Sequence, residues 1–292
     1  MKRALTIVCC MLTVFFSCTH HRKAEIEAVR TQSQQHFDIG EYQQALDGYR
    51  GLYARFPDEP DLAGRYIDMV EIIKKQSDKA YARGKYATAD KIYRLLLDDC
   101  DHFSGYQKKL SFSKSFLNER IRLSQIKLAE NTSRQCLSSG DFQKAIDVCR
   151  EIFRKYRKDD QAQKCLMTAA EELGETGNTA FNNREYAAAG RIYRVLRENA
   201  KIFKMAKIFA PPDLRTINAK LANCSTYLNR KGLELYRMGN LSKAVVVWED
   251  ILEFDPNNAD VKKVVDSTSD HIKNMQLQCG RSVSQTGAAG SL

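Results

Sequence analysis

The chain contains little proline and no stretch that resembles a β-strand. Five prolines occur in 292 residues, and apolar residues recur at the 3.6-residue period of a helix, with no alternation of apolar and polar residues. Proline interrupts helices more strongly than any other residue, so its scarcity agrees with this period. The sequence therefore predicts an all-helical protein.

Motifs typical of enzymes and metal centres are also absent. The chain has no G-x-x-x-x-G-K phosphate-binding loop, no G-x-S-x-G elbow, no H-E-x-x-H and no C-x-x-C. No cluster of cysteine and histidine has the spacing of a zinc site. We therefore expect no catalytic activity, no cofactor and no metal.

The N-terminus "MKRALTIVCCMLTVFFSC" has the pattern of an export signal. Two basic residues precede an uncharged, mostly apolar run of 13 residues, which is short of the roughly 20 that span a bilayer. Ending at Cys18, the segment resembles the signal of bacterial lipoproteins. That resemblance implies a signal peptide over 1–17, lipidation of Cys18, for example by palmitate, and a tether over 18–24. Since Thr19 rather than Asp follows, it also implies an outer-membrane lipoprotein of the bacterial cell envelope that faces the periplasm. An ordinary cleaved signal or an uncleaved anchor is the alternative.

The chain repeats itself internally. "GKYATADKIYRLL" begins at Gly84, and "REYAAAGRIYRVL" begins 100 residues later at Arg184. Aligning the copies places five alanines at 45, 89, 145, 189 and 244, and a turn glycine at 40, 84, 140 and 239. The fourth copy has Arg184 in place of that glycine. These copies resemble the tetratricopeptide repeat (TPR), a helix–turn–helix of about 34 residues.

The alanines are 44, 56, 44 and 55 residues apart, so each copy is longer than the standard repeat. The added residues are helix-compatible, so we expect longer first helices. The resulting fold prediction is all-α: a right-handed α-α superhelix of about five TPR-like helical hairpins with extended first helices and a C-terminal capping helix. The predicted boundaries are a repeat domain over 25–279, with repeats near 29–57, 73–100, 115–157, 160–200 and 213–258, a cap over 259–279 and a disordered tail over 280–292.

In such an array the first helices line a concave groove that binds proteins or peptides. The candidate partner-binding residues are Phe37, Lys74, Tyr81, Arg134, Asn178, Phe181, Asn182, Tyr236 and Arg237. Their aromatic members recur three residues before four of the five turns, and the third copy has Leu137 there. Packing of these side chains between helices is the alternative interpretation. The carboxylate clamp of some TPR proteins is not expected, because Gly174 stands where its lysine would be.

A second candidate is a basic stripe in the fourth repeat. Basic residues recur every three or four positions with apolar residues between them, a pattern that suits phosphate head groups or an acidic partner. The stripe comprises Arg191, Arg194, Arg197, Lys201, Lys204 and Lys207. A solvated outer face is the alternative. Removal of Lys2 and Arg3 with the signal lowers the formal net charge from +10 to +8, but we expect no nucleic-acid partner for an exported protein.

Six cysteines lie beyond the predicted signal, and export permits disulfides. The alignment places Cys136 and Cys149 opposite each other on the two helices of the third repeat. We expect both to be buried thiols, with a disulfide between them as the alternative.

The functional prediction is a lipid-anchored TPR scaffold or adaptor that binds another envelope protein or peptide in its groove. Two alternatives stay open. One is an assembly factor for outer-membrane β-barrels, secretins or pili, and the other is a glycan-binding module of an export system.

Overall fold

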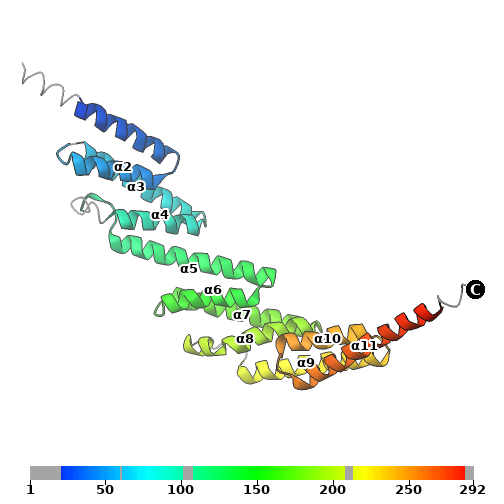
Figure 1. The fold of residues 1–292 in the computed structure, drawn as a ribbon. Coiled ribbons are helices and arrows are strands. Elements are labelled where there is room, and N and C mark those ends of the chain that lie inside the picture. The colour runs from blue at the N-terminus through cyan, green and yellow to red at the C-terminus, as the bar shows by residue number, and fades with distance from the viewer. Residues whose placement is uncertain (1–20, 60, 101–107, 208–212, 287–292) are drawn as a thin grey trace, which may run out of the picture. The chain divides into compact units, whose positions relative to one another are not determined.

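The structure is a computed structural model that describes residues 21–59, 61–100, 108–207 and 213–286, with side chains as far as residue 277. Within these ranges the chain forms helices joined by short connections, and no strand occurs (Figure 1). The all-helical prediction is confirmed. None of the described helices combines the length and the apolar composition that a membrane span requires. Cys18 and the predicted signal peptide lie outside the described residues.

The chain divides into two compact units at residue 128, each with its own hydrophobic core. Unit 1 contains a helix over residues 21–38, then α2 (Tyr42–Arg55), α3 (Leu62–Ala82), α4 (Tyr86–Asp99) and the first part of α5 (Lys114–Ser139). Unit 2 contains the rest of α5, then α6 (Phe142–Lys155), α7 (Asp160–Asn182), α8 (Tyr186–Met205), α9 (Leu214–Arg237), α10 (Leu241–Phe254) and α11 (Ala259–Thr286). Where the prediction has one repeat domain over 25–279, the contacts group the repeats into two units. In a repeat array each hairpin packs mainly on its neighbours.

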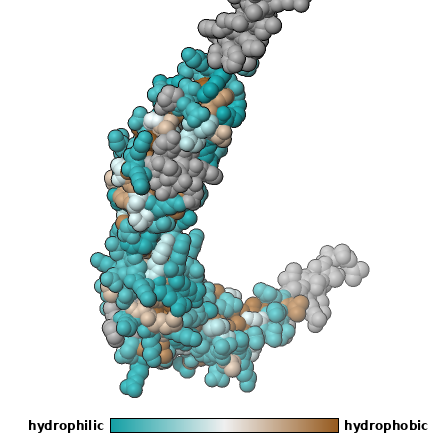
Figure 2. Space-filling view, turned by 90° about the vertical axis from the view of Figure 1, so that its left-hand side faces the viewer, coloured by the Kyte–Doolittle hydropathy of each residue, from teal (hydrophilic) through white to brown (hydrophobic). Residues whose placement is uncertain are grey.

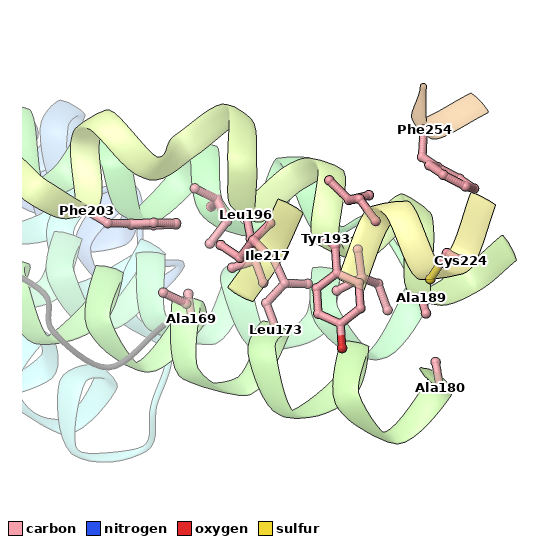
Figure 3. Packing of buried hydrophobic residues seen from close by; sticks show 14 of the residues in the cluster. Ala169, Leu173, Ala180, Ala189, Tyr193, Leu196, Phe203, Ile217, Cys224 and Phe254 are labelled. Carbon is pink, nitrogen blue, oxygen red and sulfur yellow. The ribbon is translucent and has the colours of Figure 1, made fainter. Parts of the chain in front are cut away.

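Unit 2 has the larger core, in which small and large side chains alternate. Figure 3 shows Tyr193 and Leu196 of α8 beside Leu173 of α7 and Ile217 of α9. Ala189, one of the five alanines that the alignment places in register, is fully buried. Burial of these side chains supplies most of the favourable free energy of folding, at about 25 cal/mol per Å² of apolar surface.

The first helices are long, as the spacing predicts. The helices α3, α5, α7 and α9 have 21, 26, 23 and 24 residues, whereas the second helices α2, α4, α6 and α10 have 14 each. The second helix α8 is an exception, with 20 residues. Its last turns carry Lys201 and Lys204, which extend beyond the position where its duplicate α4 ends.

Each hairpin turns at one residue in the left-handed region. The values of φ are 83° at Gly40, 73° at Gly84, 83° at Gly140, 65° at Arg184 and 77° at Gly239. In every turn the next N–H reaches back five residues to a carbonyl oxygen, as in Glu41→His36 at 2.8 Å and Glu185→Ala180 at 2.9 Å. This is the Schellman motif, which satisfies carbonyl groups at the end of a helix. Arg184 therefore adopts the conformation that glycine adopts in the other four copies.

Both predicted chain ends are more helical than expected. The tether predicted for 18–24 is helical from residue 21, where Arg22 forms an ion pair with Glu59 (3.4 Å) and lies 5.0 Å from the ring centroid of Phe56. The cap predicted to end at 279 continues as α11 to Thr286, so the predicted disordered tail is wrong for 280–286. Residues 280–286 contain no proline, the residue that most strongly interrupts a helix. Residues 287–292 lie outside the described part.

The structure pairs Cys149 with Cys165 in a disulfide, with a Cα–Cα distance of 5.6 Å. The expectation of a buried Cys149 thiol, or of a bond from Cys149 to Cys136, is wrong. Cys136 is a buried thiol, as expected. The bond joins α6 to the first helix of the following hairpin, because both cysteines lie on the faces that these two helices bury against each other.

We expect Arg184→Gly to stabilise the protein by about 1 kcal/mol, because only glycine adopts the left-handed region without steric cost. The midpoint of urea unfolding measures this change. The matched control is Gly84→Arg at the equivalent turn 100 residues earlier, which should destabilise by a similar amount. Equal midpoints for Arg184→Gly and the wild type would contradict the strain assigned to this turn.

The double variant Cys149→Ala/Cys165→Ala should lose about 3 kcal/mol of stability, the contribution expected of a bond that closes a loop of this length. Urea unfolding with and without dithiothreitol provides the measurement. The reductant should lower the midpoint of the wild type and leave that of the variant unchanged. A wild-type midpoint that does not respond to the reductant would show that the bond is absent.

Candidate functional site

The predicted groove residues all lie on first helices, but they fall in two units. Unit 1 holds Phe37, Lys74 and Tyr81, and unit 2 holds Arg134, Asn178, Phe181, Asn182, Tyr236 and Arg237. We use the name first-helix face for the side of the first helices, within each unit, that carries these predicted groove residues. Arg134, Asn178, Asn182 and Arg237 are exposed on it.

The recurring rings close the hairpins. Ring centroids are 5.8 Å apart in Phe37–Tyr42, 5.2 Å in Tyr81–Tyr86, 5.5 Å in Phe181–Tyr186 and 6.1 Å in Tyr236–Trp248. In the first three pairs the partner ring begins the second helix of the same hairpin. Aromatic pairs at these distances stabilise by about 0.5–1.5 kcal/mol. The rings therefore serve helix packing, and only Tyr236 is exposed, at 40%.

In both duplicated hairpins a cation from the next first helix lies over the ring that stands three residues before the turn. Arg120 of α5 lies 5.3 Å from the ring centroid of Tyr81, and Lys220 of α9 lies 4.0 Å from that of Phe181. Both ring and cation recur at an offset of 100 residues. Such contacts contribute about 0.5–2 kcal/mol, and they keep a positive charge beside an aromatic surface.

The candidate Asn178 is held in place by a hydrogen bond from the second helix of its own hairpin. The hydroxyl of Tyr193 donates to Asn178 Oδ1 at 2.7 Å, as that of Tyr93 donates to Asp78 Oδ1 at 2.5 Å in the other copy. Burial, with a smaller contribution from Cys224, raises the pKa of Tyr193 to about 12, so this donor stays protonated at neutral pH. The amide oxygen of Asn178 is thus occupied, and its amide nitrogen is the group that could meet a partner.

In unit 1 the candidate Lys74 belongs to a small cluster. Its ammonium forms an ion pair with Asp78 at 2.9 Å and lies 5.2 Å from the ring centroid of Phe116. Arg120 lies over the same ring, also at 5.2 Å. The cluster therefore presents two cations and two half-buried rings, those of Tyr81 and Phe116.

In unit 2 the corresponding cluster is more open. Tyr227 of α9 stacks on Tyr186 with centroids 4.4 Å apart and an interplanar angle of 8°, and Arg230 lies 5.4 Å from the centroid of Tyr227. Tyr227 is 37% exposed. Together with Phe181 and Lys220, these residues form a surface of rings and cations on α7, α8 and α9. Such a surface favours carboxylates and planar or apolar side chains.

Sequence reasoning missed Phe116, Arg120, Lys220, Tyr227 and Arg230. One signal was present: Arg120 and Lys220 are separated by the same 100 residues as the duplicated phrase. Phe116 and Tyr227 have no aromatic counterpart at that offset, so their role depends on which side chains the folded helices bring together.

The predicted basic stripe divides into two parts. Its first three members bind the C-terminal end of α10: Arg191 forms an ion pair with Glu253 at 2.6 Å, Arg194 donates to the Glu253 carbonyl, and Arg197 donates to the Phe254 carbonyl at 3.4 Å. Cations stabilise the C-terminus of a helix, where carbonyl groups lack partners. Lys201, Lys204 and Lys207 are exposed and form no ion pair within the described ranges.

A polar cleft of about 560 Å³ lies between α9 and the α10–α11 connection. Several of its polar groups already have partners within the protein. Asn229 accepts from Trp248 Nε1 at 3.1 Å, Thr226 donates to the Ala222 carbonyl at 2.9 Å, and Asn258 donates to Asp255 at 3.1 Å. These bonds occupy part of the polar lining.

Comparisons with known proteins add little. No protein-family model matches the chain, and no curated protein matches it. Among solved structures the chain is similar to a "circular tandem repeat protein with novel repeat topology and enhanced subunit contact surfaces", at 15% identity and a TM-score of 0.24, over 92% of this chain and 67% of that chain. A likeness at this TM-score carries no argument about function.

Proposed function

We propose that the protein is a lipid-anchored scaffold of the bacterial cell envelope that binds another protein through its first-helix face. The observation that carries the proposal is the cation held over a ring in both duplicated hairpins, Arg120 over Tyr81 and Lys220 over Phe181. Besides stabilising the packing, each contact keeps a positive charge beside an aromatic surface at the same place in the two hairpins. Helical repeats are used mainly for protein binding.

The chemistry of the face indicates the kind of partner. Arg230 is exposed beside the exposed Tyr227, while Lys220 is half-buried against Phe181. A segment with carboxylates and large apolar side chains would match these groups. In the view of Figure 2 hydrophilic residues predominate and hydrophobic ones form small separate patches.

Two further features support export and anchoring. The disulfide between Cys149 and Cys165 is typical of proteins in oxidising compartments. The second feature is the N-terminal segment, which resembles a lipoprotein signal. The resemblance of the hairpins to tetratricopeptide repeats supports the scaffold part of the proposal. The glycan-binding alternative is less favoured at Tyr186 and Tyr227, because these rings stack on each other and Arg230 lies over the ring of Tyr227.

The lipid anchor is tested at Cys18. We expect Cys18→Ala to abolish labelling by a palmitate analogue and to release the protein from membranes, because a single cysteine carries the acyl chains. Helical content measured by circular dichroism should not change. Labelling that persists in Cys18→Ala would refute the anchor and leave the binding proposal intact.

The binding face is tested with a photo-crosslinking amino acid at Asn182, on the exposed side of α7. In cells it should form an adduct with a discrete protein, and Lys220→Glu/Arg230→Glu should reduce the yield at least tenfold because the partner's carboxylates would be repelled. The control, Lys262→Glu/Lys263→Glu, makes the same charge change on exposed positions of α11 and should leave the yield unchanged. Equal loss in both double variants would exclude a specific role for the first-helix face.

A further inference from the structure

A second surface lies on the other set of helices. A cleft of about 350 Å³ opens between the second helices α6 and α8 of unit 2. Three apolar side chains line it: Phe153 and Ile202 are buried, and Met205 is 53% exposed. Four basic side chains complete most of the lining: Arg150, Arg154, Arg157 and Lys201. The volume lies within the range of about 300–1,000 Å³ found for binding pockets.

One side of the cleft is held rigid by hydrogen bonds. Arg150 forms an ion pair with Asp147 at 2.7 Å and donates to Asn199 Oδ1 at 3.1 Å. Asn199 is 4% exposed, and its amide nitrogen donates to Gln143 Oε1 at 3.1 Å and to the Val195 carbonyl at 2.9 Å. This network joins α6 to α8 and fixes one wall of the cleft before any ligand arrives, which lowers the entropic cost of binding.

Two of the four basic side chains of the cleft have no acidic partner within the described part of the chain, whereas the other charged groups are paired. Glu198, an acidic lining residue, already pairs with Arg194 at 2.6 Å, and Arg154 pairs with Glu151 at 3.0 Å. Arg157 and Lys201 are exposed and have no acidic partner among the described side chains. The cleft therefore carries a net positive charge next to an exposed apolar side chain.

The duplicated hairpins provide an internal comparison. In unit 1 the residue equivalent to Arg150 is Arg50, and it lies 3.4 Å from the buried carboxylate of Asp99. Unit 2 has the neutral Asn199 at the position of that acid. In sequence the equivalents of Arg154, Arg157 and Lys201 are Ala54, Pro57 and Asp101. All four differences make unit 2 more positive than unit 1.

We propose that this cleft binds an acidic segment of a partner protein, with an apolar side chain against Phe153, Ile202 and Met205 and carboxylates at Arg157 and Lys201. A free phosphate would leave the apolar lining unused. A membrane surface would need a broad exposed apolar face, whereas here one exposed methionine borders a recess. The site is separate from the first-helix face and does not depend on it.

The probe is a random-peptide phage library, panned on the purified full-length chain. Selected peptides should combine aspartate or glutamate with a large apolar residue. A fluorescent copy of the best peptide should bind at least tenfold more weakly to Arg157→Glu/Lys201→Glu, as measured by fluorescence anisotropy. Met205→Gln should also weaken binding, because the apolar contact is lost. Since all three positions are exposed, the variants should keep the circular dichroism spectrum of the wild type.

The controls distinguish this site from the alternatives. Lys262→Glu/Lys263→Glu makes the same charge change on α11, and Lys220→Glu/Arg230→Glu alters the first-helix face. Neither should change the affinity more than about twofold. If either control lowered the affinity for the peptide as much as Arg157→Glu/Lys201→Glu does, the effect would be one of net charge and the proposal would be overturned. The proposal would also be overturned if the library yielded no acidic–apolar peptide. The same holds if the chain bound anionic phospholipid vesicles in place of a peptide and the cleft variants weakened that binding.

Discussion

The left-handed turn between the two helices of each hairpin is the constraint on which the remaining structure depends. One residue with positive φ and one N–H that reaches back five residues set the point at which the chain reverses. The turn also fixes which residues of the two helices meet. A ring three residues before it then lies against a ring two residues after it, as in Tyr81–Tyr86. A shift of one residue at the turn would rotate the second helix by about 100° and remove that contact.

Given this register, the positions of the cations follow. The ring that closes a hairpin leaves one face toward the next first helix, and Arg120 and Lys220 lie over that face. The same packing explains the first half of the basic stripe: Arg191, Arg194 and Arg197 lie on the side of α8 that meets the end of α10. The basic residues of α8 thus fall into a group that contacts α10 and a group that stays exposed, and their spacing along the chain does not distinguish the two.

The duplication shows which features the fold requires and which it allows to vary. The turn, the buried alanine and the tyrosine that donates to the first helix recur in both halves. The charge between the second helices does not recur: a buried Asp99 faces Arg50 in one half, and Asn199 faces Arg150 in the other. In both halves an arginine of one second helix meets a polar side chain of the other second helix, and only the charge of that side chain differs.

The sequence by itself determined the helical class, the hairpin register and the long first helices, because these depend on local periodicity, turn residues and the spacing of Ala89 and Ala189. It also identified Arg184 as the turn residue without glycine. Only the tertiary structure decided that Cys149 bonds to Cys165, since that contact joins successive hairpins while the alignment compares positions within one. Folding likewise distinguished Arg191 from Lys201, because Arg191 meets Glu253 of α10, a helix distant in the chain, whereas Lys201 stays exposed. Long-range contacts of this kind leave no periodic signal along the sequence.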